Sequence, residues 1–560
     1  MSPGPKAEEL VPFPVKEQLP GIDYCLTSPP PWVISESFSI ILFPEAMLLG
    51  FQHYLVMLGT TVIIPTILVP LMGGGHVIRI SFSTYAALKR GEGEGDSDAA
   101  LRGWDQHSVT GSLRDAAPRC DRGSYTYLLP TISIILSRRY AYIIDPYEDR
   151  KLNASPGCAH HEIHTGALIL SSVFQIVVGY FGLWRIFVRL FLSPLAAVPF
   201  VTLSALGLYY IAFPELAKCV EIGLPALVLL VIFSLYVPHS YTRRRVIFDR
   251  FALLIVVAIV WLYAFILTVA GAYRDRPPET QFSCRVDRAG LIYASPWVRV
   301  PYPFQWGGPR FHAGDVFAMM AASFASLIES TGTFIIASRF ASATFIPPSV
   351  CSRGVGWQGI AILLDGIFGT ANGSAASVEN AGLLALTRVG SRRVIKISAC
   401  FMIFFSVFAK FGAVLASIPF PLVAALYCVL FAYAASAGIG LLQFCNLNSL
   451  RNKFIIGISL FLGLSIPQYF REYEIEAGFG PVHTRSRSFN DIVNVIFSSP
   501  ATVAAIIAYL LDWTHLYWEP SVRRDSGWHW WEKFRYYSTD TRSEEFYSLP
   551  YGLSKYFPSL

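Results

Sequence analysis

Long apolar runs separated by short polar loops make up most of the chain. Ten of these runs are long enough to cross a hydrocarbon core of about 30 Å as helices. Inside a bilayer the backbone must satisfy its own hydrogen bonds, so such runs form helices. The pattern therefore predicts an all-α polytopic membrane protein, with spans near residues 47–72, 165–184, 194–213, 222–239, 251–272, 314–338, 397–418, 420–442, 454–470 and 491–511.

Three further apolar runs, at 124–137, 357–370 and 377–387, are too short or too interrupted to span. Two of them open alike, because the stretches GSYTYLLPTISIIL and GSAASVENAGLLAL both begin with Gly-Ser. Interrupted segments in corresponding places of two halves point to the central site of a transporter, where two repeats meet. The sequence thus predicts a site built from these two stretches.

The charge is low and arranged by loop. Only 15% of the residues are charged, against about 25% in soluble domains. The net charge of +6 lies in short loops, so it indicates topology rather than nucleic-acid binding. Lys and Arg fall in alternate loops after residue 165, which makes those loops cytoplasmic. We therefore expect cytoplasmic tails at 1–40 and 514–560, a transmembrane domain at 41–513, and loops 273–313 and 471–490 outside.

Cysteine usage adds little. Nine cysteines are scattered without CxxC pairs. Most lie in or beside apolar runs, where a free cysteine behaves as a small buried hydrophobe. Cys284 lies in a long polar loop and could be oxidised, but no spacing identifies a partner.

Motifs for catalysis fail on inspection. HHEIH at 160–164 lies in an expected polar loop and lacks the spacing of a zinc site, and GEGEG at 91–95 lacks the Lys-Ser/Thr of a phosphate-binding loop. No catalytic constellation stands out. We therefore expect no enzyme, no metal and no cofactor.

Two carboxylates stand inside apolar runs, where ionisable side chains are costly and face a cavity or a partner. Glu329 lies among small Ser and Thr neighbours that let another backbone approach. It either contacts a transported solute or bonds a neighbouring helix for packing alone. Asp365 could carry a proton, end a helix near Gly366 and Gly369, or serve as a structural acceptor.

Polar pairs mark two further places. Glu379 and Asn380 open a short helix, whose unsatisfied N–H groups and positive dipole end would face the cavity. Ser377 or Asn380 could cap that helix. A carboxylate accepts only, whereas an amide both donates and accepts, so together they can read the edge of a flat heterocycle. Gln52 and His53 form a second pair, in which the histidine binds solute or a neighbouring side chain.

At these residues the chain resembles the nucleobase-ascorbate transporter family, the xanthine/uracil permeases. VENAGLLALTRVGSRR is similar to the family signature, FQHYLVMLGTTVIIPTILVP to its first span, ASLIESTGTF to its eighth and GWQGIAILLDGIFGT to its ninth. LQFCNLNSLRNKFIIGISLFLGLSIPQYF and the closing EEFYSLPYGLSKYFPS resemble the plant branch. The resemblance implies fourteen spans in an inverted 7+7 repeat, divided into core and gate domains.

The resemblance also implies roles for particular residues. Substrate-binding roles fall on Glu329, Glu379, Asn380, Ser124, Tyr125, Gln52 and His53, and coupling or gating roles on Asp365, Thr387 and Arg388. Family members carry purines, uracil or ascorbate, driven by protons or sodium. The expected partners are a nucleobase and the lipid bilayer, with no nucleic acid and with a homodimer left open. The expected location is the plasma membrane.

One segment departs from this pattern. The second span should occupy roughly 80–122, yet residues 89–122 hold 13 charged residues among 34 and no Ile, Phe, Met or Tyr. Such a stretch cannot cross a bilayer as a helix. We interpret 76–122 as an aberrant polar segment, produced by a misjoined exon or a shifted reading frame. The main hypothesis is proton-coupled nucleobase uptake; the alternatives are another solute, such as ascorbate, or a product that does not transport.

Overall fold

The computed structural model describes residues 45–57, 121–123, 125–135, 156–237, 245–286 and, with short gaps, 297–531. The first described segment, 45–57, is helical. The first half then contains β1 (Asp121–Gly123), η4 (Tyr125–Tyr127), α4 (Leu128–Ile135), α5 (Pro156–Tyr180), α6 (Leu183–Phe191), α7 (Pro194–Leu206), η7 (Tyr209–Ile211), α8 (Phe213–Ala217), α9 (Val220–Val231), the π-helical turn η8 (Ile232–Tyr236), α11 (Arg245–Val269) and α12 (Pro278–Cys284).

The second half is again almost entirely helical. It contains α14 (Ala313–Phe340), α15 (Pro348–Phe368), β2 (Ser374–Ala376), α16 (Val378–Thr387), α17 (Arg392–Val407), α19 (Phe420–Gly440), η9 (Leu441–Phe444), α20 (Leu450–Ala477), α21 (Arg487–Phe497), α22 (Pro500–Thr514), α23 (Pro520–Asp525) and α24 (Trp528–Trp531). The predicted all-α class is therefore confirmed, with β1 and β2 forming one two-stranded sheet within the described ranges.

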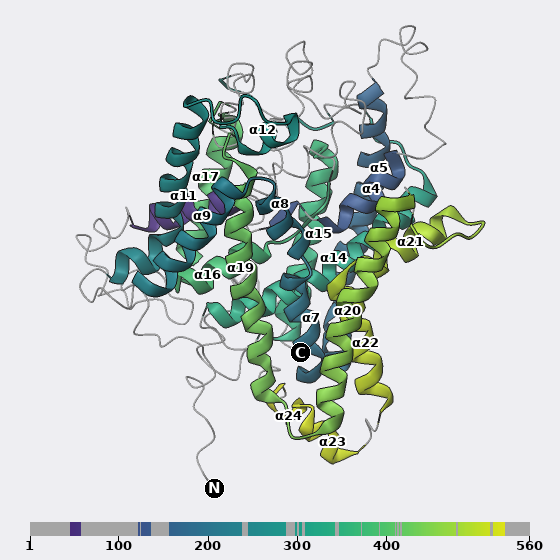
Figure 1. Cartoon of the computed structure of the whole chain (residues 1–560). Coiled ribbons are helices and arrows are strands. Elements are labelled where there is room, and N and C mark those ends of the chain that lie inside the picture. The colour runs from purple at the N-terminus through teal and green to yellow at the C-terminus, as the bar shows by residue number, and fades with distance from the viewer. Residues whose placement is uncertain are drawn as a thin grey trace, which may run out of the picture.

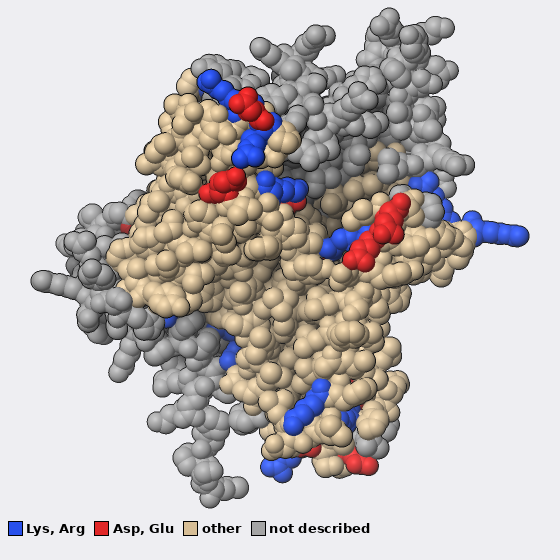
Figure 2. Space-filling model, in the orientation of Figure 1, with Lys and Arg blue, Asp and Glu red and all other residues tan. Residues whose placement is uncertain are grey.

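The helices have the length and composition of membrane spans. Within the described residues six are long and apolar enough to cross a bilayer, and the bent pair α21–α22 brings the number to seven. Figure 2 shows charged side chains near the two ends of the visible face, with a broad uncharged band between them. Lipid tails are apolar, so such a band fits the hydrocarbon region. The chain is an integral, multi-pass membrane protein.

The helices pack in two groups. One group contains α5, α6, α14 and α15, and the short α16 packs between α14 of this group and α19 of the other. The other contains α7, α19, α20 and α22, with α9 and α11 beside α19. Figure 1 shows α20 and α22 side by side, with α23 and α24 at their lower end. The groups meet where α14 contacts α7 and α22, and where α16 contacts α19, while α21 also packs on α14.

A bend interrupts the predicted span at 491–511. The structure divides this run into α21 and α22, which meet at 83°. Pro500 cannot supply the N–H that a continuous helix needs, and it disfavours helical geometry at the residue before it. Ser499 accordingly adopts an extended backbone and caps α22, its Oγ accepting the N–H of Thr502. The predicted span is therefore a bent pair of helices rather than one continuous helix.

A second prediction failed in the opposite direction. The run at 357–370 is not a short, broken segment but part of α15, a helix of 21 residues that begins at Pro348. Glycines lower the apparent hydrophobicity of its first half, yet they permit close packing against α5. A Cβ on Gly179 would lie only 2.2 Å from the backbone nitrogen of Gly356. Small residues at this contact let the two helices touch through their backbones.

The predicted span at 222–239 is present as the apolar helix Val220–Tyr236, in which α9 continues directly into the π turn η8. Of the predicted span at 397–418, α17 covers the part up to Val407, and residues 409, 412, 413, 415 and 416 lie outside the described residues. The expected polar loop around HHEIH is the first part of α5. His164 is fully buried there, with Nε2 2.7 Å from Oγ1 of Thr131 on α4. This contact joins α5 to α4.

A disulfide joins Cys219, just after α8, to Cys284 at the end of α12. The two residues are 65 positions apart, and both are almost completely buried. Cys219 is therefore an exception to the expectation that most cysteines are free buried hydrophobes, and Cys284 has the partner that spacing could not identify. Disulfides persist in oxidising compartments, which agrees with the expectation that loop 273–313 lies outside.

Candidate functional site

The centre of the site is a small antiparallel sheet that joins the two halves of the chain. Gly123 pairs with Ser374, and Asp121 pairs with Ala376. Each strand is followed by a short helical segment, η4–α4 after β1 and α16 after β2. Because the strands are antiparallel, the two short segments leave the sheet in opposite directions. The two Gly-Ser stretches thus meet, as the sequence predicted, although Ser124 itself lies outside the described residues.

Helix α14 holds β2 in place. Ser326 donates its hydroxyl to the carbonyl of Ser374 (3.3 Å), and the N–H of Ala376 donates to Oγ of Ser330 (3.1 Å). Gln358 of α15 donates to the same carbonyl of Ser374 (3.1 Å). Serines at positions four apart lie on one face of a helix, so the Ser-rich composition of α14 builds a polar edge for the strand.

Glu329 lies on this helix, next to Ser330, and contacts both neighbouring segments. Its Oε2 accepts a 2.7 Å hydrogen bond from Oγ1 of Thr126 in η4. Its Oε1 accepts a 2.9 Å hydrogen bond from Oγ of Ser499, at the bend between α21 and α22. The carboxylate is half-buried. It therefore links η4, the segment after β1, to the bend between α21 and α22, and its oxygens bond protein groups rather than face lipid.

The second carboxylate lies at the start of α16. Ser377 caps this helix, its Oγ accepting the backbone N–H of Asn380 (3.2 Å). The same hydroxyl donates to Oε2 of Glu379 at 2.9 Å. Both Glu379 and Asn380 are almost completely buried. The predicted cap is confirmed in its Ser377 form, and the positive end of the helix dipole adjoins the carboxylate.

Asn380 connects this helix to the first described helix, 45–57. Its Nδ2 donates to Oγ of Ser377 (3.1 Å), which leaves Oδ1 as the acceptor for Nδ1 of His53 at 2.9 Å. His53 is thus the donor in that bond. Gln52 is fully buried, and its amide oxygen and nitrogen have no hydrogen-bond partner among the described residues. A buried amide with unmade bonds is costly unless a ligand or another group completes it.

Asp365 and Tyr125 lie at the edges of this cluster. Asp365 is buried near the end of α15, where its Oδ1 accepts a 2.9 Å hydrogen bond from Thr370. Gly369, with φ of 68°, ends the helix just beyond it. Tyr125 is buried in η4, edge-on to the ring of Tyr210. This position fits the helix-end, proton-carrier and structural-acceptor interpretations of Asp365 alike.

Thr387 and Arg388 lie at the opposite end of α16 from Glu379. Thr387 is buried and returns its hydroxyl to the carbonyl of Leu383 (2.9 Å). Arg388 is exposed and ends the helix with a left-handed backbone, φ of 56°. A helix of ten residues is about 15 Å long. The structure therefore does not bring these two residues to the carboxylate cluster.

Gly382 permits the close packing of α16 on its neighbour. A Cβ at this position would lie 2.2 Å from the carbonyl oxygen of Leu430 in α19. The structure places a helix there.

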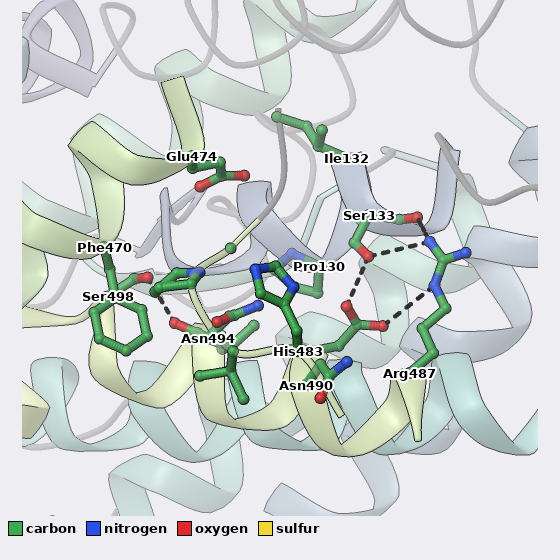
Figure 3. Close-up of a pocket in the computed structure, with 15 residues that line it drawn as sticks. Pro130, Ile132, Ser133, Phe470, Glu474, His483, Arg487, Asn490, Asn494 and Ser498 are labelled. Carbon is green, nitrogen blue, oxygen red and sulfur yellow. Dashed lines mark hydrogen bonds and ion pairs between the residues drawn. The ribbon is translucent and has the colours of Figure 1, made fainter. Parts of the chain in front are cut away.

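A polar cavity of about 280 Å³ lies between α4, α20, α21 and the segment before α21. Figure 3 shows Ser133 and Arg487 pointing toward each other at one end of it. Ser133 donates to Oδ1 of Asp491 (2.9 Å), and Arg487 donates to the carbonyl of Ser133 (2.6 Å). Ser498 lines the other end, one residue before the Ser499 that contacts Glu329. The cavity lining and the contact with Glu329 thus involve adjacent residues, Ser498 and Ser499.

Sequence reasoning missed Thr126, Ser499 and this cavity. Thr126 lies in the stretch GSYTYLLPTISIIL but carries no charge to single it out. The signal for Ser499 was the Ser-Ser-Pro stretch at 498–500, which predicts a helix break and a cap. Neither signal could name Glu329 as the partner, because the contacts cross 170 and 203 positions of sequence.

Comparison with known proteins decides the family. A sequence profile described as a permease family, Xan_ur_permease, matches residues 159–472. The nucleobase-ascorbate transporter LPE1 of Zea mays is 63% identical over 100% of both chains. The chain belongs to the plant branch of the nucleobase-ascorbate transporter family. Nucleobase-ascorbate transporter 4 of Arabidopsis thaliana is 58% identical over 99% of both chains.

Membership settles the general activity. As a nucleobase-ascorbate transporter, the protein is a transporter of a small molecule and not an enzyme. Among solved structures, the transmembrane domain of the cyanobacterial bicarbonate transporter BicA matches with a TM-score of 0.40 and 13% identity, over 76% of this chain and 95% of that chain.

Proposed function

We propose that the protein is a secondary active transporter that takes up nucleobases together with protons across the plasma membrane. One observation carries the proposal. The small sheet brings Glu329 and Glu379 into one hydrogen-bonded assembly, because Ser330 beside the first binds Ala376, three residues before the second. Two acids in a membrane interior are expensive, and functional sites are where they occur.

The chemistry of this assembly suits a flat heterocycle with both donors and acceptors on its edge. Glu379 can accept N–H groups of such a ring, and the first N–H groups of α16 can donate to its carbonyl oxygens. Gln52 offers an amide whose bonds are unmade among the described residues. These groups would pair with the edge of a purine or of uracil. They suit an anion such as ascorbate less well, because two carboxylates repel it.

Proton coupling would follow from the cost of carrying charge through the membrane. A proton taken from the outside would neutralise one carboxylate as the base binds, and Asp365 is buried near the same sheet as a further carrier. Sodium is the alternative coupling ion. A neutralised site crosses the apolar region at a lower cost than a charged one.

The movement that releases substrate would separate the two helix groups. Glu329 belongs to α14 in one group, and Ser499 belongs to the start of α22 in the other. Their hydrogen bond must therefore lengthen or break when the groups slide. Transport by rocking of one bundle against another requires contacts of this kind, which form in one state and open in the next.

The test is uptake by cells that lack their own nucleobase permeases. Labelled xanthine, uric acid, adenine, guanine and uracil would be supplied at two external pH values, with ascorbate as competitor. Glu329→Gln and Glu379→Ala should each abolish uptake without lowering the surface signal of a tagged chain. Normal uptake by both variants would refute the assignment of the site. If none of the bases is taken up and ascorbate binds, the proposed substrate class changes from nucleobases to ascorbate.

A chain that never reaches the cell surface would support the remaining alternative, a product that does not transport. Residues 76–120 lie outside the described residues, and Asp121 and Arg122, which close the aberrant segment, form most of β1. Replacing 76–120 by an apolar span, while keeping β1, should then restore both the surface signal and uptake. If this replacement restores neither the surface signal nor uptake, the segment is not the cause of the defect.

A further inference from the structure

An apolar groove of about 250 Å³ lies on the opposite side of α14 from the hydrogen bonds to β2. Helices α6 and α14 form one wall, and α7 and α22 form the other. Its lining is Trp184, Phe187, Val188, Leu192, Ala196, Phe200, Phe324, Ile328, Thr331, Ala505, Ile506, Tyr509 and Leu510. Leu510 is 48% exposed. The groove therefore opens on the side of the helix bundle, where the solvent is lipid.

The inner wall is fixed by one aromatic side chain. The indole N–H of Trp184 donates to Oγ1 of Thr331 at 3.0 Å. Its ring stacks on Phe187, with 4.6 Å between centroids, and meets Phe324 edge-on at 6.4 Å. With its one donor already bonded, Trp184 presents only carbon to the groove. Water gains nothing in such a space, whereas an acyl chain fills it.

The end of the groove at Tyr509 and Leu510 lies beside a pair of stacked aromatic side chains. Tyr509 and Trp513 stack at 6.3 Å near the end of α22, and Trp513 is 49% exposed. Exposed Trp and Tyr at helix ends mark the level of lipid headgroups. Arg451, at the start of α20 and beside a loop predicted to be cytoplasmic, pairs with Asp512 (3.0 Å), which lies between these two aromatic residues in the sequence. The groove thus ends at the leaflet that the Lys/Arg pattern makes cytoplasmic.

Helix α6 supplies a charge at this level. Arg185 and Arg189 are four positions apart and so lie on one face, about 100° around the helix from Trp184 and Val188 in the groove. Arg189 is exposed, and neither arginine forms an ion pair with a described residue. Guanidinium groups bind phosphate in a bidentate manner. Anionic lipids concentrate in the cytoplasmic leaflet.

We propose that this groove is a binding site for an anionic glycerophospholipid, with an acyl chain between α6–α14 and α7–α22 and the headgroup phosphate on Arg185 and Arg189. The charge selects a net negative headgroup, and the apolar lining selects the chain. Because α6–α14 and α7–α22 belong to different helix groups, the bound chain contacts both. The site is independent of the transported substrate.

Lipid binding to the purified full-length chain tests the proposal. Native mass spectrometry with added phosphatidylglycerol or phosphatidylcholine should show preferential retention of phosphatidylglycerol. The double variant Arg185→Gln/Arg189→Gln should bind phosphatidylglycerol roughly 30-fold more weakly. The control Arg274→Gln/Arg276→Gln, which removes two exposed arginines after α11, should bind like the unchanged chain. Equal retention of the two lipids, or unchanged binding by Arg185→Gln/Arg189→Gln, overturns the proposal.

A second measurement locates the chain and does not depend on how the arginine variant folds. Phosphatidylglycerol with a photoreactive group on its acyl chain should label peptides from α6 and from residues 505–510. Ala505→Phe, which fills the groove, should remove that labelling. Labelling of α11 and α20 without α6 and α22, or labelling that survives Ala505→Phe, would show that the lipid lies elsewhere.

Discussion

Ser499 donates a 2.9 Å hydrogen bond to Oε1 of Glu329, across the bend between α21 and α22. Hydrogen bonds to charged groups contribute about 1.5–3 kcal/mol. We expect Ser499→Ala to raise the substrate concentration for half-maximal uptake at least about tenfold, because the carboxylate loses its orientation. Ser499→Thr keeps the hydroxyl and should keep most of the affinity. Unchanged half-saturation in Ser499→Ala, at equal surface level, would exclude this role.

The same substitution also removes the cap of α22, and the two effects can be separated. An alanine cap costs about 0.5–2 kcal/mol, whereas a glycine cap costs only a few tenths. Ser499→Gly should therefore lose affinity as Ser499→Ala does, while its melting temperature in detergent stays close to that of the unchanged chain. If Ser499→Gly keeps normal affinity, the loss of affinity in Ser499→Ala comes from the lost helix cap and not from the lost hydrogen bond to Glu329.

The contact of His53 with Asn380 is expected to couple the first described helix to α16. Asn380→Ala leaves a buried histidine without its acceptor, which costs about 1–3 kcal/mol. His53→Ala should destabilise the chain as well. The double variant should be less destabilised than the two single effects added together, by about 0.5–3 kcal/mol. Thermal unfolding of the purified chain measures all three, and strict additivity would argue against the contact.

The disulfide between Cys219 and Cys284 closes a loop of 65 positions. Loop-closure entropy for that length amounts to about 4 kcal/mol. Cys219→Ser/Cys284→Ser should therefore lower the melting temperature in detergent substantially. A reductant that cannot cross membranes should do the same on intact cells, since we expect the bridge on the outer side. Failure of that reductant to act, with a linked peptide pair still present, would reverse the predicted orientation.

Gly382 offers a packing test with a matched control. A Cβ at Gly382 would lie 2.2 Å from a backbone oxygen of α19, which cannot move away alone. Gly382→Ala should cost about 1–3 kcal/mol through overpacking. A Cβ added to Gly457, within α20, would meet no described atom within 4 Å, so Gly457→Ala should be neutral or stabilising by up to about 1 kcal/mol. The fraction of monodisperse chain after heating reports both, and equal behaviour would contradict the close contact.

Sequence patterns predicted what depends on local chemistry. The apolar runs gave the helical membrane class, and the Ser-x-x-Asn stretch gave the cap of α16, because capping involves residues three positions apart. The run at 491–511 was misjudged since hydropathy does not register the effect of Pro500 on the backbone. The run at 357–370 was misjudged since glycines such as Gly356 look like breaks when they serve close helix packing.

The partners within the site could not be predicted from one sequence. His53 and Asn380 are 327 positions apart, and Glu329 and Ser499 are 170 apart. No local period connects such residues, so only folding reveals them. The same holds for Cys219 and Cys284, where nine cysteines gave no reason to prefer one pairing. Buried polar residues could be recognised individually, but their arrangement could not.

The pairing of Gly123 with Ser374 has a consequence for biosynthesis. About 250 positions separate the two strands, and translation adds about 5–20 residues per second. The backbone groups of β1 must therefore wait roughly 10–50 s for their partner to emerge from the ribosome. During that interval they need water, the translocon or a chaperone as a substitute. Assembly of this chain is thus a post-insertion event, completed only when its second half has entered the membrane.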